Sequence, residues 1–242
     1  MAPLIPPGIR GGADALAIVD WQEGGAGQVH SWIEAQGYRV ACFVHADDTP
    51  PVVDVAAARK SREAKIFDYP LPGSYKGIPL VSARAWPEVI IAHGIHKALI
   101  LMPDPHARFD NIALARQHGL ELIRAIHPTA LVMADAVIHE NVVLHARAFI
   151  GYRSEIHPGV VVNSGASLDH HNVAHPCARI DPGVVTAGNV TFGRFATVHT
   201  GAVIINRIRI GEGAIVGAGA VIIRDVPPGA TVVGNPGRLL PP

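Results

Sequence analysis

Hydrophobic residues recur at every sixth position over residues 126–222, and the phase of this pattern never changes. A period of six fits neither an α-helix, which repeats every 3.6 residues, nor a strand with alternating faces. It fits a coil of short flat faces, in which three faces of six residues complete one triangular turn. The column reads Ile126, Val132, Ile138, Leu144, Ile150, Ile156, Val162, Leu168, Ala174, Ile180, Thr186, Phe192, Val198, Ile204, Ile210, Val216 and Ile222.

A second column stands four positions after the first and is mostly small or β-branched, beginning Ala130, Ala136, Val142, Ala148, Ser154, Val160 and Ala166. We expect the first column to fill a thin prism, and the second to be small because it turns a tight corner. In this pattern the chain resembles the hexapeptide-repeat acyltransferases, whose domain is a left-handed parallel β-helix. The left hand is implied by the resemblance, because spacing alone does not set it.

The first half of the chain alternates predicted strands and helices. An apolar run over 15–19 is followed by a glycine-rich turn at 24–27, a helix-like segment over 28–36 and a second apolar strand over 38–44. This order predicts one parallel β-α-β unit, and the α/β alternation continues to residue 123. We therefore predict a small Rossmann-like domain.

The chain is accordingly predicted to be α/β followed by β. Residues 1–12, rich in Pro and Gly, form a flexible tail, and 13–123 form the Rossmann-like domain. Residues 124–228 form the β-helix. Residues 229–242 follow a break in the six-residue phase and cap the open end of the prism.

Composition excludes several functional classes. Lys plus Arg and Asp plus Glu each number 20, so the net charge is zero with His neutral, which argues against a nucleic-acid partner. The N-terminus lacks the pattern of a signal peptide, and no apolar stretch reaches the roughly 20 residues that span a bilayer. We expect a cytoplasmic protein without a membrane span. Cys42 and Cys177 lie in different predicted domains and are expected to be reduced thiols.

Two features of the first domain are candidate ligand sites. A glycine-rich turn that opens a helix can bind phosphate through free backbone amides and the helix dipole, which makes Gly25 and Gly27 candidates. The turn lacks the spacing of a dinucleotide fingerprint, and close packing of helix on strand would explain it equally well. Asp47 and Asp48 stand where α/β sheets bind ligands, although a solvated turn is the alternative.

The order of motifs resembles the nucleotide-sugar N-acetyltransferases of bacterial glycan synthesis, together with the similar sialic acid O-acetyltransferases. The matching positions run along almost the whole chain: Gly25, Gly27, Asp47, Asp48, residues 126–131, Asn163, Ser164, Asp169, His170, residues 187–190 and residues 234–238. The resemblance implies a homotrimer with acetyl-CoA between neighbouring β-helices, a nucleotide-sugar acceptor held by the first domain, and no metal.

The resemblance also implies roles for single residues. His170 matches the general base, and an imidazole with a pKa of about 6.5 can accept the amine proton at neutral pH. The backbone N–H of Gly188 matches the donor to the acetyl carbonyl. Asn163 would contact the acceptor sugar. Residues matching coenzyme A contacts are Ala187, Ala218, Gly234, Asn235 and Pro236.

The chain departs from the family at two positions of the site. Relatives often place a carboxylate directly after the base, where this chain has His171. They also commonly carry a second histidine nine residues after the base, where this chain has Arg179. Asp169 could orient His170 instead, and Arg179 could donate to an acetyl oxygen or to a phosphate of coenzyme A.

The histidines of the second half form columns under an 18-residue repeat. His139, His157 and His175 share one column, and a plain interpretation is that stacked polar residues line an outer face. A second interpretation is a zinc site like that of the gamma-class carbonic anhydrases, built from His157, His175 and His170 of a neighbouring chain. A third is an idle trimeric scaffold that only binds nucleotide, motivated by His171 and Arg179.

Overall fold

The computed structural model describes residues 5–51 and 73–241. The chain forms two compact units. The first contains the chain up to Pro103 together with Ala113–Leu122. The second contains Asp104–Ile112 and everything from Ile123 onwards.

The first unit is built on a six-stranded sheet in the order β3-β4-β2-β1-β5-β6. All neighbours pair in parallel except β3 and β4. The central strand β1 is the predicted apolar run, and all five of its residues are buried. The strands are β1 (Ala15–Val19), β2 (Arg39–His45), β3 (Ser74–Tyr75), β4 (Ile78–Ser82), β5 (Lys97–Ile100) and β6 (Glu121–Leu122).

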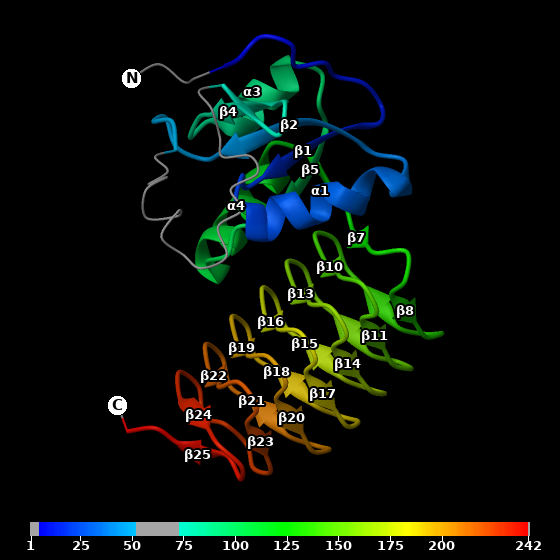
Figure 1. Cartoon of the computed structure of the whole chain (residues 1–242), viewed down its shortest axis with the longest axis vertical. Coiled ribbons are helices and arrows are strands. Elements are labelled where there is room, and N and C mark those ends of the chain that lie inside the picture. Colours follow the sequence, from blue (N-terminus) through cyan, green and yellow to red (C-terminus); the bar gives the residue numbers. More distant parts are fainter. Residues whose placement is uncertain (1–4, 52–72, 242) are drawn as a thin grey trace. The chain divides into compact units, whose positions relative to one another are not determined.

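Helical segments connect these strands (Figure 1). The turn Glu23–Gly27 is π-helical and leads directly into α1 (Gln28–Ile33), which continues as a 3-10 turn over Glu34–Gln36. Gly37 ends this helix with a φ of 85°, a left-handed conformation that glycine adopts without a steric penalty. The other helices are α3 (Trp86–Ala92) and α4 (Pro105–Gln117).

The second unit is a prism of triangular coils, each of 18 residues (Figure 1). Its three faces are sheets, here called faces 1, 2 and 3, in which all neighbours pair in parallel except β24 and β25 of face 1. Face 1 contains β7 (Ala125–Ile126), β10 (Val143–Leu144), β13 (Val161–Val162), β16 (Arg179–Ile180), β19 (Thr197–Val198), β22 (Ile215–Val216), β24 (Thr231–Val233) and β25 (Arg238–Leu239).

The other two faces consist of two-residue strands only. Face 2 contains β8 (Leu131–Val132), β11 (Phe149–Ile150), β14 (Ser167–Leu168), β17 (Val185–Thr186), β20 (Val203–Ile204) and β23 (Val221–Ile222). Face 3 contains β9 (Val137–Ile138), β12 (Glu155–Ile156), β15 (Val173–Ala174), β18 (Thr191–Phe192) and β21 (Arg209–Ile210).

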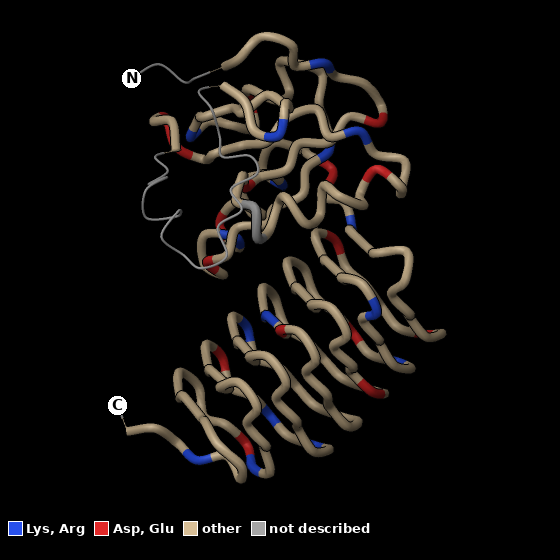
Figure 2. Tube along the Cα trace, viewed as in Figure 1, with Lys and Arg blue, Asp and Glu red and all other residues tan. Residues whose placement is uncertain are grey.

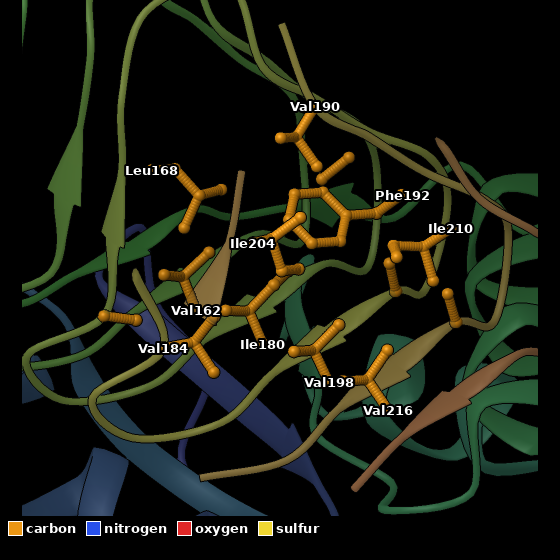
Figure 3. Close-up of a cluster of buried hydrophobic side chains, with 14 of the residues drawn as sticks. Val162, Leu168, Ile180, Val184, Val190, Phe192, Val198, Ile204, Ile210 and Val216 are labelled. Carbon is orange, nitrogen blue, oxygen red and sulfur yellow. The ribbon is translucent and has the colours of Figure 1, made fainter. Parts of the chain in front are cut away.

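Both sequence columns point into the prism and form one continuous core (Figure 3). The corner itself is turned by the residue directly before each member of the second column. From Asp135 to Gly219 this residue has a positive φ at every sixth position. Where it is not glycine it is strained, and Asn141 and Asn189 are among the residue types that tolerate this conformation best. The second column is therefore small because it is buried beside the corner.

The segment after Asp225 closes the last coil. Val226 forms a parallel bridge with Ile210, and β24 pairs in parallel with β22 two residues earlier than the 18-residue spacing requires. Strand β25 then turns back antiparallel to β24. A returning strand covers the edge that an open coil would expose.

In the part of the chain that the structure describes, Figure 2 shows basic and acidic residues interspersed along each unit, without a long run of either sign. Within the described residues, no helix has the length and hydropathy needed to cross a bilayer.

Candidate active site

His170 lies on the edge where face 2 turns into face 3, in the turn 169–172 between β14 and β15. Its side chain is exposed. The backbone N–H of His170 donates to Asp169 Oδ1 at 2.7 Å, and the N–H of His171 donates to the Tyr152 carbonyl one coil earlier at 2.8 Å. The Asp169 carboxylate therefore fixes the main chain at His170 rather than the imidazole ring.

The ring of His170 is oriented by His171. The two Nδ1 atoms are 3.0 Å apart, and the ring planes cross at 84°. One Nδ1 must carry the proton of this hydrogen bond, because a neutral imidazole has one donor and one acceptor nitrogen. If His170 donates, its Nε2 is left as an unprotonated base. At the position where the resemblance implies an orienting carboxylate, this chain therefore has a second imidazole ring in contact with His170.

Gly188 lies on the same edge, one coil beyond His170. A methyl group at its Cα would come to 2.5 Å from Nε2 and 2.7 Å from Nδ1 of His170, so the ring lies directly against the Gly188 backbone. The N–H of Asn189 donates to the His170 carbonyl at 3.0 Å, which ties the two turns together. Among the described residues, no acceptor takes the Gly188 N–H. This amide is therefore available to a developing oxyanion.

A glycine one coil earlier makes the same edge compact. A methyl group on Gly151 would come to 2.5 Å from the carbonyl carbon of Asp169 and 2.7 Å from the amide nitrogen of His170. Adjacent coils can approach this closely only because Gly151 has no side chain. The peptide that carries His170 is thereby held between two glycines of neighbouring coils.

Two predicted site residues lie elsewhere on the prism. Asn163 is on the edge between faces 1 and 2, and Arg179 is in β16 of face 1. Both are bound to the buried carboxylate of Asp181: Arg179 Nε donates to Oδ1 at 2.6 Å and Asn163 Nδ2 at 3.2 Å. His199 Nδ1 is 2.9 Å from Oδ2 of the same group. Within one chain, Arg179 does not occupy the second-histidine role beside His170.

The residues expected to contact coenzyme A also lie on different parts of the prism. Ala187 is next to Gly188 on the His170 edge, whereas exposed Ala218 is on the edge that carries Asn163. The segment Gly234, Asn235 and Pro236 follows β24, and the Gly234 carbonyl accepts the N–H of Val221 at 3.0 Å. The candidates of one chain therefore fall on two different edges of the prism.

In the first unit the glycine-rich turn uses its own amides. The N–H groups of Gly25 and Gly27 both donate to the Gln22 carbonyl, at 3.2 and 3.3 Å. They are therefore not free donors for a phosphate in this conformation. Gly25 instead allows the turn to lie close to Asp20, because a methyl group on Gly25 would be 2.9 Å from Asp20 Oδ2.

Asp20 is a buried carboxyl group that the sequence analysis did not single out. Its Oδ1 accepts the N–H groups of Trp21 and Gln22, whereas its Oδ2 has no hydrogen-bond partner among the described residues. Burial raises the pKa of Asp20 to about 6, against the opposing effect of the two amides. The sequence feature that could have identified Asp20 is its position directly after the apolar run 15–19.

Asp47 and Asp48 follow β2 and bind Arg84, which follows β4. Asp48 Oδ1 accepts the Arg84 N–H at 2.9 Å, and Asp47 Oδ1 accepts the N–H and hydroxyl of Thr49. These bonds from Thr49, with Arg84 nearby, lower the pKa of Asp47. Both aspartates lie at the carboxyl edge of the parallel strands, where the sequence predicted them.

The described residues contain one cluster with metal-ligand chemistry, formed by His139, Glu155 and His157. Their ligand atoms lie within 4.8 Å of one another. His139 Nε2 is 2.9 Å from Glu155 Oε1, and the rings of His139 and His157 stack at 4.9 Å. His175 stacks on His157 at 5.2 Å. This column lies on the edge between faces 3 and 1, so the zinc interpretation would need His170 from another chain.

Solved structures resemble this chain over nearly its whole length. PerB from Caulobacter crescentus, in complex with CoA and GDP-perosamine, is 26% identical with a TM-score of 0.81, over 95% of this chain and 99% of that one. The acetyltransferase domain of PglB from Neisseria gonorrhoeae, in complex with acetyl coenzyme A, is 27% identical with a TM-score of 0.78, over 95% and 100%.

This chain is an acyltransferase with the hexapeptide-repeat fold. The predicted resemblance and the predicted fold class, with its left-handed β-helix, are thereby confirmed. WeeI from Acinetobacter baumannii supports the fold alone, at 19% identity and a TM-score of 0.60 over 93% of this chain and 99% of that one. No family model and no curated protein matches the sequence of this acyltransferase.

Proposed function

We propose that the protein transfers the acetyl group of acetyl-CoA to the amine of a nucleotide-linked amino sugar. The observation that carries this proposal is the likeness of both units together, over 95% of the chain, to a GDP-perosamine N-acetyltransferase in complex with CoA and its nucleotide sugar. A β-helix acting on a small free acceptor would have no use for the Rossmann-like unit. GDP-linked amino sugars are the first acceptors to test.

The chemistry is direct transfer within a ternary complex. The amine nitrogen attacks the thioester carbonyl carbon while Nε2 of His170 accepts the amine proton. The tetrahedral intermediate then collapses, the C–S bond breaks, and the proton passes to the sulfur of the leaving CoA. His171 orients the base through the Nδ1 contact of 3.0 Å. The available N–H of Gly188 stabilises the oxyanion next to that base.

The acceptor's nucleotide would bind at the carboxyl edge of the Rossmann-like sheet. Supporting features there are Asp47 and Asp48, with Arg84 beside them, and the close approach of Gly25 to Asp20. The amides of Gly25 and Gly27 are used by the Gln22 carbonyl, so we assign recognition to side chains rather than to a phosphate cradle. The reaction needs no metal, and we assign it to the cytoplasm, where acetyl-CoA and nucleotide sugars are made.

A homotrimer would complete the site. The base and the oxyanion donor lie on one edge of the prism, and Asn163 and Ala218 lie on another. If the second edge of a neighbouring chain faces His170, the acetyl-CoA groove forms between the two copies. Such an interface is heterologous and can close into a ring, and the resemblance implies a ring of three copies.

The proposal is tested with acetyl-CoA and a panel of GDP-, UDP-, dTDP- and CMP-linked amino sugars. Release of free CoA thiol is measured for the parent and for His170→Ala. A true acceptor also raises the unfolding temperature by binding the folded state. Thiol release that requires both substrates and His170 supports transfer. Nucleotide-sugar binding without thiol release would favour the idle scaffold.

A further inference from the structure

The interior of the prism contains three polar side chains. Every other member of the two sequence columns is apolar, but Ser154, Asn172 and Thr186 are polar. Their exposed fractions are 0%, 0% and 3%. Burying a polar group costs free energy unless it is hydrogen-bonded, so three of them in one place require a reason.

These side chains form one hydrogen-bond network around Asn172. The Nδ2 group of Asn172 donates to the Asp169 carbonyl at 2.8 Å and to Thr186 Oγ1 at 2.7 Å. Its Oδ1 accepts the N–H of Val190 at 2.6 Å. Ser154 Oγ accepts the N–H of Asn172 at 3.1 Å and donates to the Asp169 carbonyl at 2.9 Å. Asn172 thus uses both donors and its acceptor.

This network replaces the backbone bonds that close ordinary turns of the prism. At the equivalent position of most other turns, the N–H donates to the carbonyl three residues earlier, for example from Ala148 to His145, at 3.1 Å. In the turn 169–172 the equivalent N–H goes to Ser154 Oγ, and in the turn 187–190 it goes to Asn172 Oδ1. Both turns are therefore held by side chains.

The two turns in which a side chain accepts this N–H are the ones that carry His170 and Gly188. A single side chain, Asn172, binds the Asp169 carbonyl, which directly precedes His170, and the Val190 N–H, two residues after Gly188. It therefore links the proposed base to the proposed oxyanion donor from inside the prism. A fully satisfied network of buried side chains is rigid, because moving one member breaks several bonds at once.

We propose that Asn172, with Ser154 and Thr186, is a positioning group that sets the distance between the His170 ring and the Gly188 amide. It touches neither substrate. The inference rests on the proposed function, since it assigns these two residues as base and oxyanion donor. Its physical basis is that small displacements of catalytic groups cost large factors in rate.

The decisive variant is Asn172→Val. Four other members of the same column are valine, so the prism accepts this side chain, and both turns can then close with ordinary backbone bonds. Replacing a buried polar side chain by an apolar one of similar size is neutral for stability when the groups that it bound find other partners. We expect an unchanged or higher unfolding temperature, a kcat lower by roughly 10- to 100-fold, and KM for acetyl-CoA within about 2-fold of the parent.

A second pair isolates one bond. Thr186→Val removes the hydroxyl acceptor of Asn172 Nδ2 at constant shape, and Thr186→Ser restores it. We expect a loss of kcat in the first and recovery in the second. Val160→Ala is the matched stability control: it opens the same buried column on the edge between faces 3 and 1, and it should lower the unfolding temperature without lowering kcat.

The outcomes separate this inference from the proposed function. If the parent transfers acetyl groups and Asn172→Val and Thr186→Val do so at the parental kcat, the positioning role is wrong. If the parent is inactive on every acceptor, the proposed function fails instead. The inference is then judged by a crystal structure of Asn172→Val: a His170 ring displaced from Gly188 supports it, and an unmoved ring overturns it.

Discussion

The imidazole of His170 occupies the space that a side chain at residue 188 would need, so Gly188 and His170 form one steric unit. Gly188→Ala should push the ring outward and lower kcat by roughly 100-fold, because the base and the oxyanion donor lose their alignment. Steady-state kinetics with saturating acetyl-CoA measures the effect.

Gly165→Ala is the control for this substitution. Gly165 has a φ of +68° with open space around it, so alanine there strains the backbone and costs about 1 kcal/mol of stability. It should lower the unfolding temperature without lowering kcat. Equal kcat for Gly188→Ala and the parent would contradict the steric relationship.

His171→Ala should lower kcat by about 10-fold, because it removes the ring that contacts Nδ1 of His170 and leaves the base without an orienting group. His171→Asp is the matched variant: its carboxylate can accept a hydrogen bond from His170 Nδ1, and aspartate tolerates the left-handed φ of 57° at this position. We expect His171→Asp to retain most of the parental kcat in steady-state kinetics. Equal kcat for His171→Ala and the parent would mean that residue 171 does not orient the base.

Asp20 makes the stability of the chain depend on pH. Its pKa rises from 3.8 in the unfolded chain to about 6 in the folded one, so the folded state binds the proton more tightly. The contribution of Asp20 to the free energy of unfolding therefore falls as the pH rises from about 4 to about 6, and it stays constant at higher pH. Asp20→Asn cannot ionise, and its free energy of unfolding relative to the parent should increase by about 2 kcal/mol between pH 4.5 and 7.5.

Urea titrations of parent and variant at the two pH values measure this difference. Asp14→Asn is a suitable control, since Asp14 is an exposed partner of Arg39. A difference between Asp20→Asn and the parent that does not change with pH would place the ionisation of Asp20 outside this range.

If each active site is formed by two neighbouring chains, two inactive variants should complement each other in a mixed oligomer. In mixtures of His170→Ala and Asn163→Ala chains, a neighbour pair can combine an intact His170 from one chain with an intact Asn163 from the other. For random mixing this occurs in about a quarter of the sites of a ring. Each variant alone should be nearly inactive, and reassembled mixtures should regain activity. Mixtures no more active than their components would place the site within one chain.

Removal of metal should leave acetyl transfer unchanged. His139 is hydrogen-bonded to Glu155 Oε1, His157 lies 3.5 Å from the same oxygen, and both histidines lie on a different edge from His170. Dialysis against a chelator followed by kinetics, with metal analysis of the parent, tests this. Stoichiometric zinc whose removal abolishes activity would favour the zinc interpretation.

The fold was predictable because its signal is repeated. Each coil adds three members to each column, and the constant phase from Ile126 to Ile222 excludes other architectures. The apolar run at β1 and the glycine at the end of the first helix were equally direct signals. Periodicity could not tell which residue turns each corner, since asparagine, arginine and histidine share that position with glycine.

The site was predictable only in part. The spacing of 18 residues places His170 beside Gly188, and the structure has them in contact. The amides of Gly25 and Gly27 are used by Gln22, which depends on the π-helical turn and is not visible in the spacing. Asn172 was visible as an exception in an apolar column, but its partners come from three coils and need the coordinates.

The account is tested most directly by identifying the product. The parent and His170→Ala are incubated with acetyl-CoA and a nucleotide-linked amino sugar, and the sugar is analysed by mass spectrometry and NMR. The account predicts one added acetyl group on the amine nitrogen, formed by the parent and at least about 100-fold more slowly by His170→Ala. Acetylation at the same rate without His170, or an acetyl group on a hydroxyl oxygen, would contradict it.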